Sequence, residues 1–126
     1  MKNTNIIQPV GIIKTMPIQW LGKERTFTEW ENSLLNMNYR QDYYWTFNLP
    51  GKPKYEVIYF YLNYNGAIRF RMNIIGYEGA KTIKCFSGEH IFGKCWIQVG
   101  APVIKLKEPV PMKGFQGFRY TKDIYE

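Results

Sequence analysis

The sequence predicts an α+β fold, in which a small open β-barrel of about six strands carries one or two helices. Three observations predict it: one amphipathic helical segment, an Asn-Gly turn between two β-prone runs, and further short strand patterns separated by Pro and Gly. Because the chain has 126 residues, of which 45% are hydrophobic, one domain over residues 1–126 with its own core is expected.

The first expected elements are a short strand and a helix. Residues 6–14 are expected to lie at a sheet edge or bend, because the proline in this run cannot donate to a ladder and the glycine favours a bulge. Residues 26–38 predict the helix, since Thr28 and Glu31 have capping-box spacing. Its apolar face recurs at intervals of three and four residues and comprises Phe27, Trp30, Leu34 and Met37.

The clearest local signal is a β-hairpin centred on Asn65-Gly66. A β-prone run at 43–47 precedes it, and the runs 56–64 and 67–77 flank the turn. Asn-Gly favours a type I′ turn because both positions require positive φ. Further strands are expected at 81–86, 94–99 and 101–106, before a Pro- and Gly-rich stretch at 108–120.

Counting outward from the turn predicts the register of the hairpin. One face is expected to be mixed, with Arg69 opposite Leu62 and Arg71 opposite Phe60. The other face is expected to be the core side, with Tyr61 opposite Phe70, Tyr59 opposite Met72 and Val57 opposite Ile74.

The positive charge is unevenly distributed along the chain. There are 17 Lys and Arg against 10 Asp and Glu, which gives a net charge of +7, and 17% of the residues are aromatic. Residues 1–50 contribute +1 and residues 51–126 contribute +6. A basic C-terminal part suits an anionic partner such as nucleic acid, although charge of this size also serves solubility.

Membrane and metal chemistry are not expected. The chain has no apolar run near the ~18 residues of a membrane span and no secretory signal pattern, so a cytoplasmic location is expected. Cys85, His90 and Cys95 form a C-x4-H-x4-C pattern that lacks the fourth ligand and the close Cys pair of zinc sites. The cysteines are therefore interpreted as small buried hydrophobic residues and His90 as a turn residue, with no metal or cofactor.

Cations and aromatic rings are combined in two stretches. Arg69 and Arg71 lie among the aromatic residues of the hairpin. The C-terminal stretch adds Lys113, Phe115, Gln116, Arg119 and Tyr120. Single-stranded nucleic acids are bound by such sets, because cations neutralise phosphates while rings stack on bases. The alternative is that arginine stems cover rings and that Phe118 and Tyr120 are core residues of a closing strand.

The same two stretches carry a family resemblance. They read YEVIYFYLNYNGAIRFRMNIIGYE at 55–78 and EPVPMKGFQGFRY at 108–120. In these stretches the chain resembles the PUA-like superfamily, and most closely its ASCH and EVE branches. The resemblance implies a PUA-like pseudo-barrel whose cleft, between barrel and helix, binds RNA or a modified base. Trp20, Trp45 and Phe115 are then the candidate aromatic walls of that cleft.

The resemblance also implies an alternative activity. Some ASCH members resemble small amidohydrolases that use Lys, Thr and Glu on acylated cytidine, which would make Lys23, Glu24 and Thr26 the catalytic set. The ASCH pattern places an Arg a short gap after Gly-x-Lys, whereas 22–25 here reads GKER, which is compressed and altered in order. A solvated Lys23 and a Glu24 that complements the helix dipole are the competing interpretation.

The expected function is therefore a non-enzymatic module that binds RNA or a single-stranded or flipped modified base. The expected nucleic-acid site comprises Trp20, Trp45, Arg69, Arg71, Lys113, Phe115, Gln116, Arg119 and Tyr120. Two alternatives stay open: an amidohydrolase acting on a modified nucleoside, and an accessory domain whose basic face meets an acidic protein.

Overall fold

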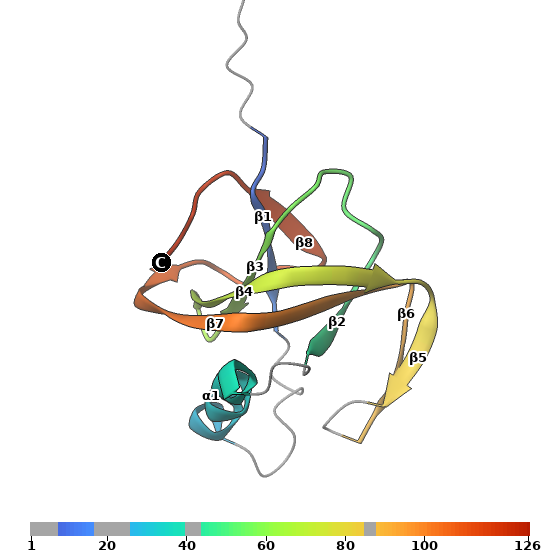
Figure 1. The fold of residues 1–126 in the computed structure, drawn as a ribbon, viewed down its shortest axis with the longest axis horizontal. Helices are drawn as coiled ribbons and strands as arrows, with labels where there is room; N and C mark the ends of the chain where they lie inside the picture. The colour runs from blue at the N-terminus through green and yellow to red at the C-terminus, as the bar shows by residue number, and fades with distance from the viewer. Residues whose placement is uncertain (1–7, 17–25, 40–43, 85–87) are drawn as a thin grey trace, which may run out of the picture.

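A six-stranded sheet curls into a half-barrel, and one helix packs against it (Figure 1). The computed structural model describes residues 8–16, 26–39, 44–84 and 88–126. The elements are β1 (Gly11–Thr15), α1 (Phe27–Leu35), the 3-10 helix η2 (Asn36–Tyr39), β2 (Trp45–Leu49), β3 (Tyr59–Tyr64), β4 (Ala67–Glu78), β5 (Lys81–Lys84), β6 (His90–Gly93), β7 (Cys95–Pro111) and β8 (Phe118–Thr121). The expected α+β fold with a small open barrel is confirmed.

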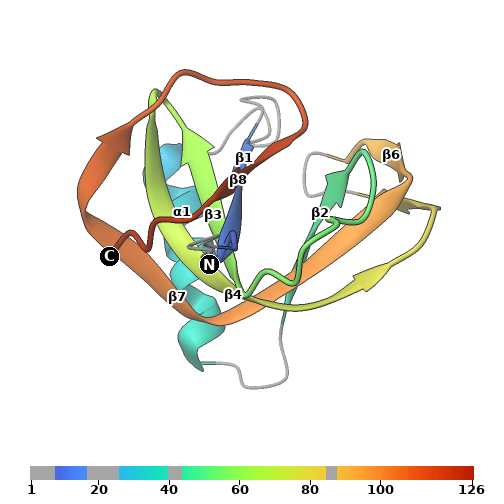
Figure 2. The same ribbon diagram turned by 90° about the horizontal axis from the view of Figure 1, so that it is seen from above.

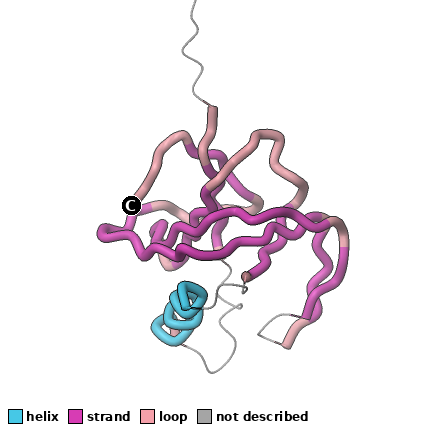
Figure 3. The backbone as a smooth tube through the Cα atoms, in the orientation of Figure 1, coloured by secondary structure: helices cyan, strands magenta, loops and turns pink. Residues whose placement is uncertain are grey.

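The order of strands in the main sheet is β2-β7-β4-β3-β1-β8, so β2 and β8 are its two edges. The strands pair antiparallel except β1 and β3, which run parallel. Strands dominate the described chain, and β5 with β6 forms a separate two-stranded arm (Figure 3). Seen from above, β2 stands apart from β8 across the open side of the curl (Figure 2).

The two faces of the sheet carry separate apolar clusters. The inner face receives side chains from all six strands and from α1, among them Ile12, Leu34 and Phe118. Phe47 of β2 and Phe60 of β3 stack with ring centroids 5.0 Å apart, although two strands lie between them in the sheet. Only the concave side of a curled sheet brings such strands together. The outer face carries a smaller cluster around Ile13, Tyr61, Ile68 and Leu106.

The helix lies where the sequence predicted it, but its cap is two residues earlier than expected. Thr26 is the N-cap, and its hydroxyl oxygen accepts a hydrogen bond from the Glu29 backbone N–H at 3.2 Å. The expected capping box of Thr28 and Glu31 is therefore wrong. The expected apolar face holds, because Trp30, Leu34 and Met37 are buried and Phe27 is partly buried.

The hairpin turn has the expected conformation but a different register. Asn65 and Gly66 have φ values of 51° and 81°, as a type I′ turn requires. Asn63 pairs with Ile68 and Leu62 pairs with Phe70, which leaves Arg69 as a bulge.

The bulge exchanges the expected faces of β3, whereas Phe70 and Met72 of β4 lie on the core side as expected. Leu62 is opposite Phe70 and Phe60 is opposite Met72, and all four side chains are buried on the inner face. Arg71 is opposite Tyr61, on the outer face. The physical cause is Arg69, whose guanidinium turns back to donate to the backbone oxygens of the turn residues Tyr64 and Asn65 at 3.0 and 2.9 Å.

Beyond the hairpin, β7 is a single long strand where two strands were expected. It pairs with β4 from Ala67 to Glu78, and three register shifts along this pairing bend the ribbon. The β5–β6 arm extends the same ribbon, and the Trp96 indole N–H fixes it by donating to the Lys81 backbone oxygen at 2.9 Å. His90 starts β6, so its expected place in a turn is wrong.

Candidate functional site

A pocket of about 350 Å³ lies at the open side of the half-barrel, between the two sheet edges. This volume falls within the range of small-molecule sites. We call it the seam pocket. The described residues that line it are Lys14, Asn48, Leu49, Pro50, Phe92, Gly93, Lys94 and Gly117.

Lys14 forms one wall of the seam pocket. It lies on β1, where strand alternation places its side chain on the inner face beside that of Ile12. Its side chain is nearly enclosed, with 8% of the residue exposed. Burial lowers the pKa of its ammonium group from 10.5 to about 8, because the charged form loses hydration.

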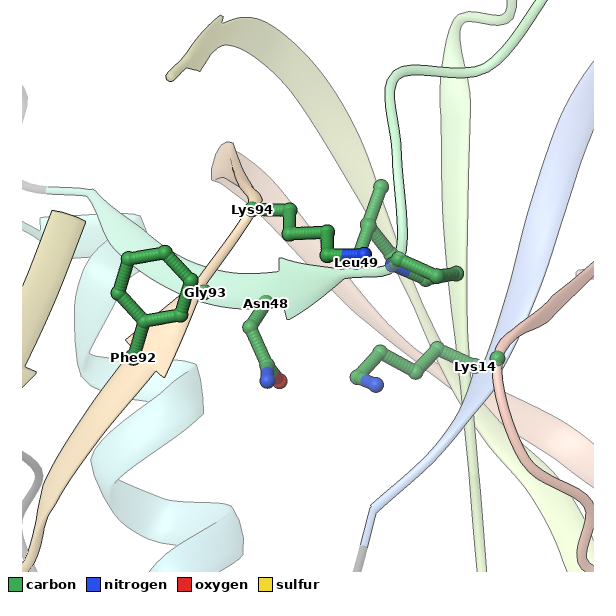
Figure 4. A pocket seen from close by; sticks show the side chains of 8 residues that line it. Lys14, Asn48, Leu49, Phe92, Gly93 and Lys94 are labelled. Carbon is green, nitrogen blue, oxygen red and sulfur yellow. The ribbon is translucent and has the colours of Figure 1, made fainter. Parts of the chain in front are cut away.

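The opposite wall comes from β2 and the β5–β6 arm. Asn48 and Lys14 extend into the pocket from its opposite sides, and Lys94 extends beside Leu49 (Figure 4). Lys94 is exposed, and Phe92 at the rim is 61% exposed. The described residues that line the pocket include two lysines and no acidic residue.

Gly93 sets how closely this wall packs. A Cβ atom at this position would lie 2.7 Å from the Trp96 ring and 3.0 Å from the Cβ of Asn48. Only glycine allows the arm to approach β2 so closely, and this approach positions Asn48 at the pocket.

The loop at 113–117 borders the pocket through Gly117 and carries four of the predicted site residues on or beside it. The Phe115 backbone N–H donates to the Thr15 hydroxyl oxygen at 3.1 Å, directly after Lys14 in β1. The Arg119 guanidinium lies over the Phe115 ring, 4.1 Å from its centroid. The structure therefore places Arg119 against Phe115, and Lys113 and Gln116 lie exposed on the same loop.

Three other predicted site residues make contacts within the fold. Trp45 is 9% exposed and packs edge-on against Trp30 at 6.0 Å, so the expected aromatic wall is a core residue. Arg69 holds the hairpin bulge. Arg71 lies over the Tyr59 ring at 4.5 Å and donates to the Tyr125 backbone oxygen at 3.3 Å, which fixes the C-terminal segment on the outer face.

Tyr120 lies apart from the Arg119 side chain. Its ring meets Tyr55 edge-on at 5.0 Å, and its hydroxyl oxygen accepts a hydrogen bond from the Lys54 backbone N–H at 2.8 Å. It is 36% exposed, so the alternative that made it a core residue is also wrong. Phe118 does pack against the inner cluster.

Of the alternative hydrolase site, only Thr26 lies within the described residues. Trp20, Lys23 and Glu24 lie outside the described residues. Thr26 caps α1, and its hydroxyl group is engaged with Glu29.

A metal centre is absent from the part of the chain that the structure describes, where no three His, Cys, Asp or Glu side chains cluster suitably. Cys95 is buried, as expected, and burial raises the pKa of its thiol. Cys85 lies outside the described residues.

The seam pocket itself was missed by sequence reasoning. One signal pointed to Lys14: in the run GIIKTM it occupies a position whose neighbours two residues away, Ile12 and Met16, are both buried. Asn48, Phe92 and Lys94 carry no comparable local signal, because the curl of the sheet alone brings them opposite β1.

None of the described helices has the length and apolar character needed to cross a membrane. No protein-family model, curated protein or solved structure matches this chain.

Proposed function

We propose that this protein binds single-stranded nucleic acid, RNA in the first place, on the surface formed by the seam pocket and the 113–117 loop. The observation that carries the proposal is their adjacency: Gly117 lines the pocket, while Phe115, two residues before it, holds the Arg119 guanidinium on its ring. The pocket and this pair meet at the β1–β8 edge of the sheet: Lys14 lies on the inner face, and Phe115 and Arg119 lie on the outer face, where Arg119 pairs with Ile13. A single strand that crosses this edge would meet cations and stacking groups in turn.

The electrostatic part of the proposal rests on four cations. Lys14 and Lys94 line the pocket, and Lys113 and Arg119 belong to the loop and to β8. Each cation that neutralises a phosphate releases condensed counterions, so binding is favoured entropically and weakens as salt rises.

The stacking part rests on two aromatic groups. Phe92 offers a largely exposed ring at the pocket rim. Phe115 is partly buried, and the flat guanidinium of Arg119 covers it. Bases stack on guanidinium planes as well as on rings, so the Arg119–Phe115 pair is a platform for one base. The exposed Gln116 amide beside it can donate to and accept from a base edge.

The test is fluorescence anisotropy with short labelled RNA and DNA single strands, and with a duplex of the same sequence, titrated from about 50 to 200 mM salt. Wild-type protein should bind single strands, and the logarithm of its binding constant should fall linearly with the logarithm of the salt concentration. Arg119→Ala should weaken binding to all sequences alike and reduce the salt slope by about one.

Lys107→Ala is the matched control, because Lys107 is an exposed cation toward the far end of β7 from the seam pocket. It should change binding much less than Arg119→Ala. Absence of binding to every strand, a flat salt response, or equal losses in the two variants would overturn the proposal.

A further inference from the structure

We propose that the seam pocket binds a terminal phosphate monoester, so that the protein recognises the phosphorylated end of a nucleic-acid strand. This inference rests on the proposed function and deepens it, because it names the part of the strand that enters the pocket. A free nucleotide carries the same chemical group, and the experiment below separates the two sources.

The position of the two pocket lysines is the first argument. Lys14 comes from β1 beside one sheet edge, and Lys94 comes from the turn between the arm and β7, next to the other edge. The two ammonium groups therefore belong to opposite walls of one small cavity. A single compact anion placed between these two lysines would interact with both.

The balance of charge is the second argument. A phosphate monoester carries a charge of about −1.5 to −2 at neutral pH, whereas an internal diester carries a single negative charge. Two ammonium groups match the monoester. Because Lys14 is almost enclosed, its charged form benefits from a nearby anion more than an exposed lysine would. Lysine is also a common phosphate ligand, acting as a point charge.

The surroundings of the cavity are the third argument. A phosphate fills only part of about 350 Å³, which leaves room for the attached sugar. The Asn48 amide points into this space and can bond a sugar hydroxyl group (Figure 4). Phe92 at the rim can stack the first base, and Gly117 leads to the Phe115–Arg119 platform for a following base.

The experiment compares oligonucleotides of one sequence with a 5′-phosphate, a 3′-phosphate or hydroxyl groups at both ends. One phosphorylated form should bind about tenfold more tightly than the hydroxyl form, as charge-assisted hydrogen bonds predict. Lys14→Met and Lys94→Met should each weaken binding of the hydroxyl form and, in addition, bring the ratio of the two affinities close to one. Lys107→Met, with the same loss of charge at a distant site, should keep the difference.

Competition with a nucleoside monophosphate and with inorganic phosphate separates the sources. Weak competition by both, together with a preference for the phosphorylated strand, supports recognition of a strand end. A nucleoside monophosphate that binds as tightly as the strand would overturn it in favour of a free nucleotide. Equal binding of phosphorylated and hydroxyl strands would overturn the inference and leave the proposed function standing. Failure of every strand to bind would overturn both.

Discussion

Replacing Lys14 with methionine should make the protein more stable while removing its preference for a phosphorylated end. The side chain is buried on the inner face, with 8% of the residue exposed, and its pKa is lowered from 10.5 to about 8 by burial. A depression of this size corresponds to about 3 kcal/mol of destabilisation of the folded state wherever the lysine is charged in both states. Methionine has a similar length and carries no charge to desolvate.

The pH dependence of this gain has a definite sign. Below pH 8 Lys14 is protonated in the folded and unfolded states, so the lowered pKa reduces the stability of the wild-type folded state by its full amount. Between about 8 and 10.5 the unfolded chain binds more protons, so wild-type stability rises with pH relative to the variant. Above that range the lysine is neutral in both states. The difference in free energy of unfolding should therefore be largest at neutral pH and disappear in strong alkali.

The assay is denaturant unfolding at a series of pH values, followed by the fluorescence of the four tryptophans. Lys107→Met should leave the free energy of unfolding nearly unchanged at every pH, because Lys107 is exposed. A Lys14→Met protein that is less stable at neutral pH, or a gain that does not vary with pH, would refute the reasoning. A stabilised variant that has lost the phosphate preference would also show that the loss is not caused by unfolding.

Three further predictions concern the scaffold. Thr26→Ala should lower the free energy of unfolding by about 1 kcal/mol in urea, because the helix loses its cap, whereas Thr28→Ala should have little effect. A larger loss of stability for Thr28→Ala than for Thr26→Ala would indicate that Thr28 is the cap. Gly93→Ala should lower the free energy of unfolding by about 1–3 kcal/mol, because the added methyl group would lie 2.7 Å from the Trp96 ring. Gly79→Ala is the control, since its methyl group meets open space, and equal melting temperatures of the two variants would contradict tight packing at Gly93. Arg71→Ala should speed amide exchange of residues 121–126 and leave the salt slope of nucleic-acid binding unchanged; a reduced slope would place Arg71 at the interface instead.

The sequence predicted the turn and the helix because both signals are local. Asn-Gly sets its own φ values, and the helical face is a property of consecutive residues. The helix start was ambiguous, since Thr26 and Thr28 each have a Glu three residues later. The tertiary structure decides between them: Glu31 accepts a hydrogen bond from the Tyr64 hydroxyl group and pairs with Lys105 at 2.9 Å. Because the Glu31 carboxylate makes these contacts, it does not cap the helix.

The candidate site was only half predictable for a similar reason. The residues at 113–119 are close in sequence, so their grouping survives folding. The register of Arg71 could not be obtained by counting, because a bulge shifts every pair beyond it. Trp45 was expected to form an aromatic wall because of its residue type. Its side chain lies on the face of β2 that packs against the core, which the residue type alone does not indicate. The seam pocket depends on the curl of the whole sheet, which no single segment encodes.

The pocket lies where the sheet is open, between its edge strands β2 and β8. No backbone ladder joins these two strands, so the distance between the pocket walls follows the curvature of the long β4–β7 ribbon, which its three register shifts bend. An anion bound to both walls of the pocket would restrain the curvature of the sheet. Amide exchange should then slow in both edge strands, β2 and β8. Substitutions at the bends of the ribbon, far from any ligand contact, should therefore adjust the width of the pocket and with it the affinity.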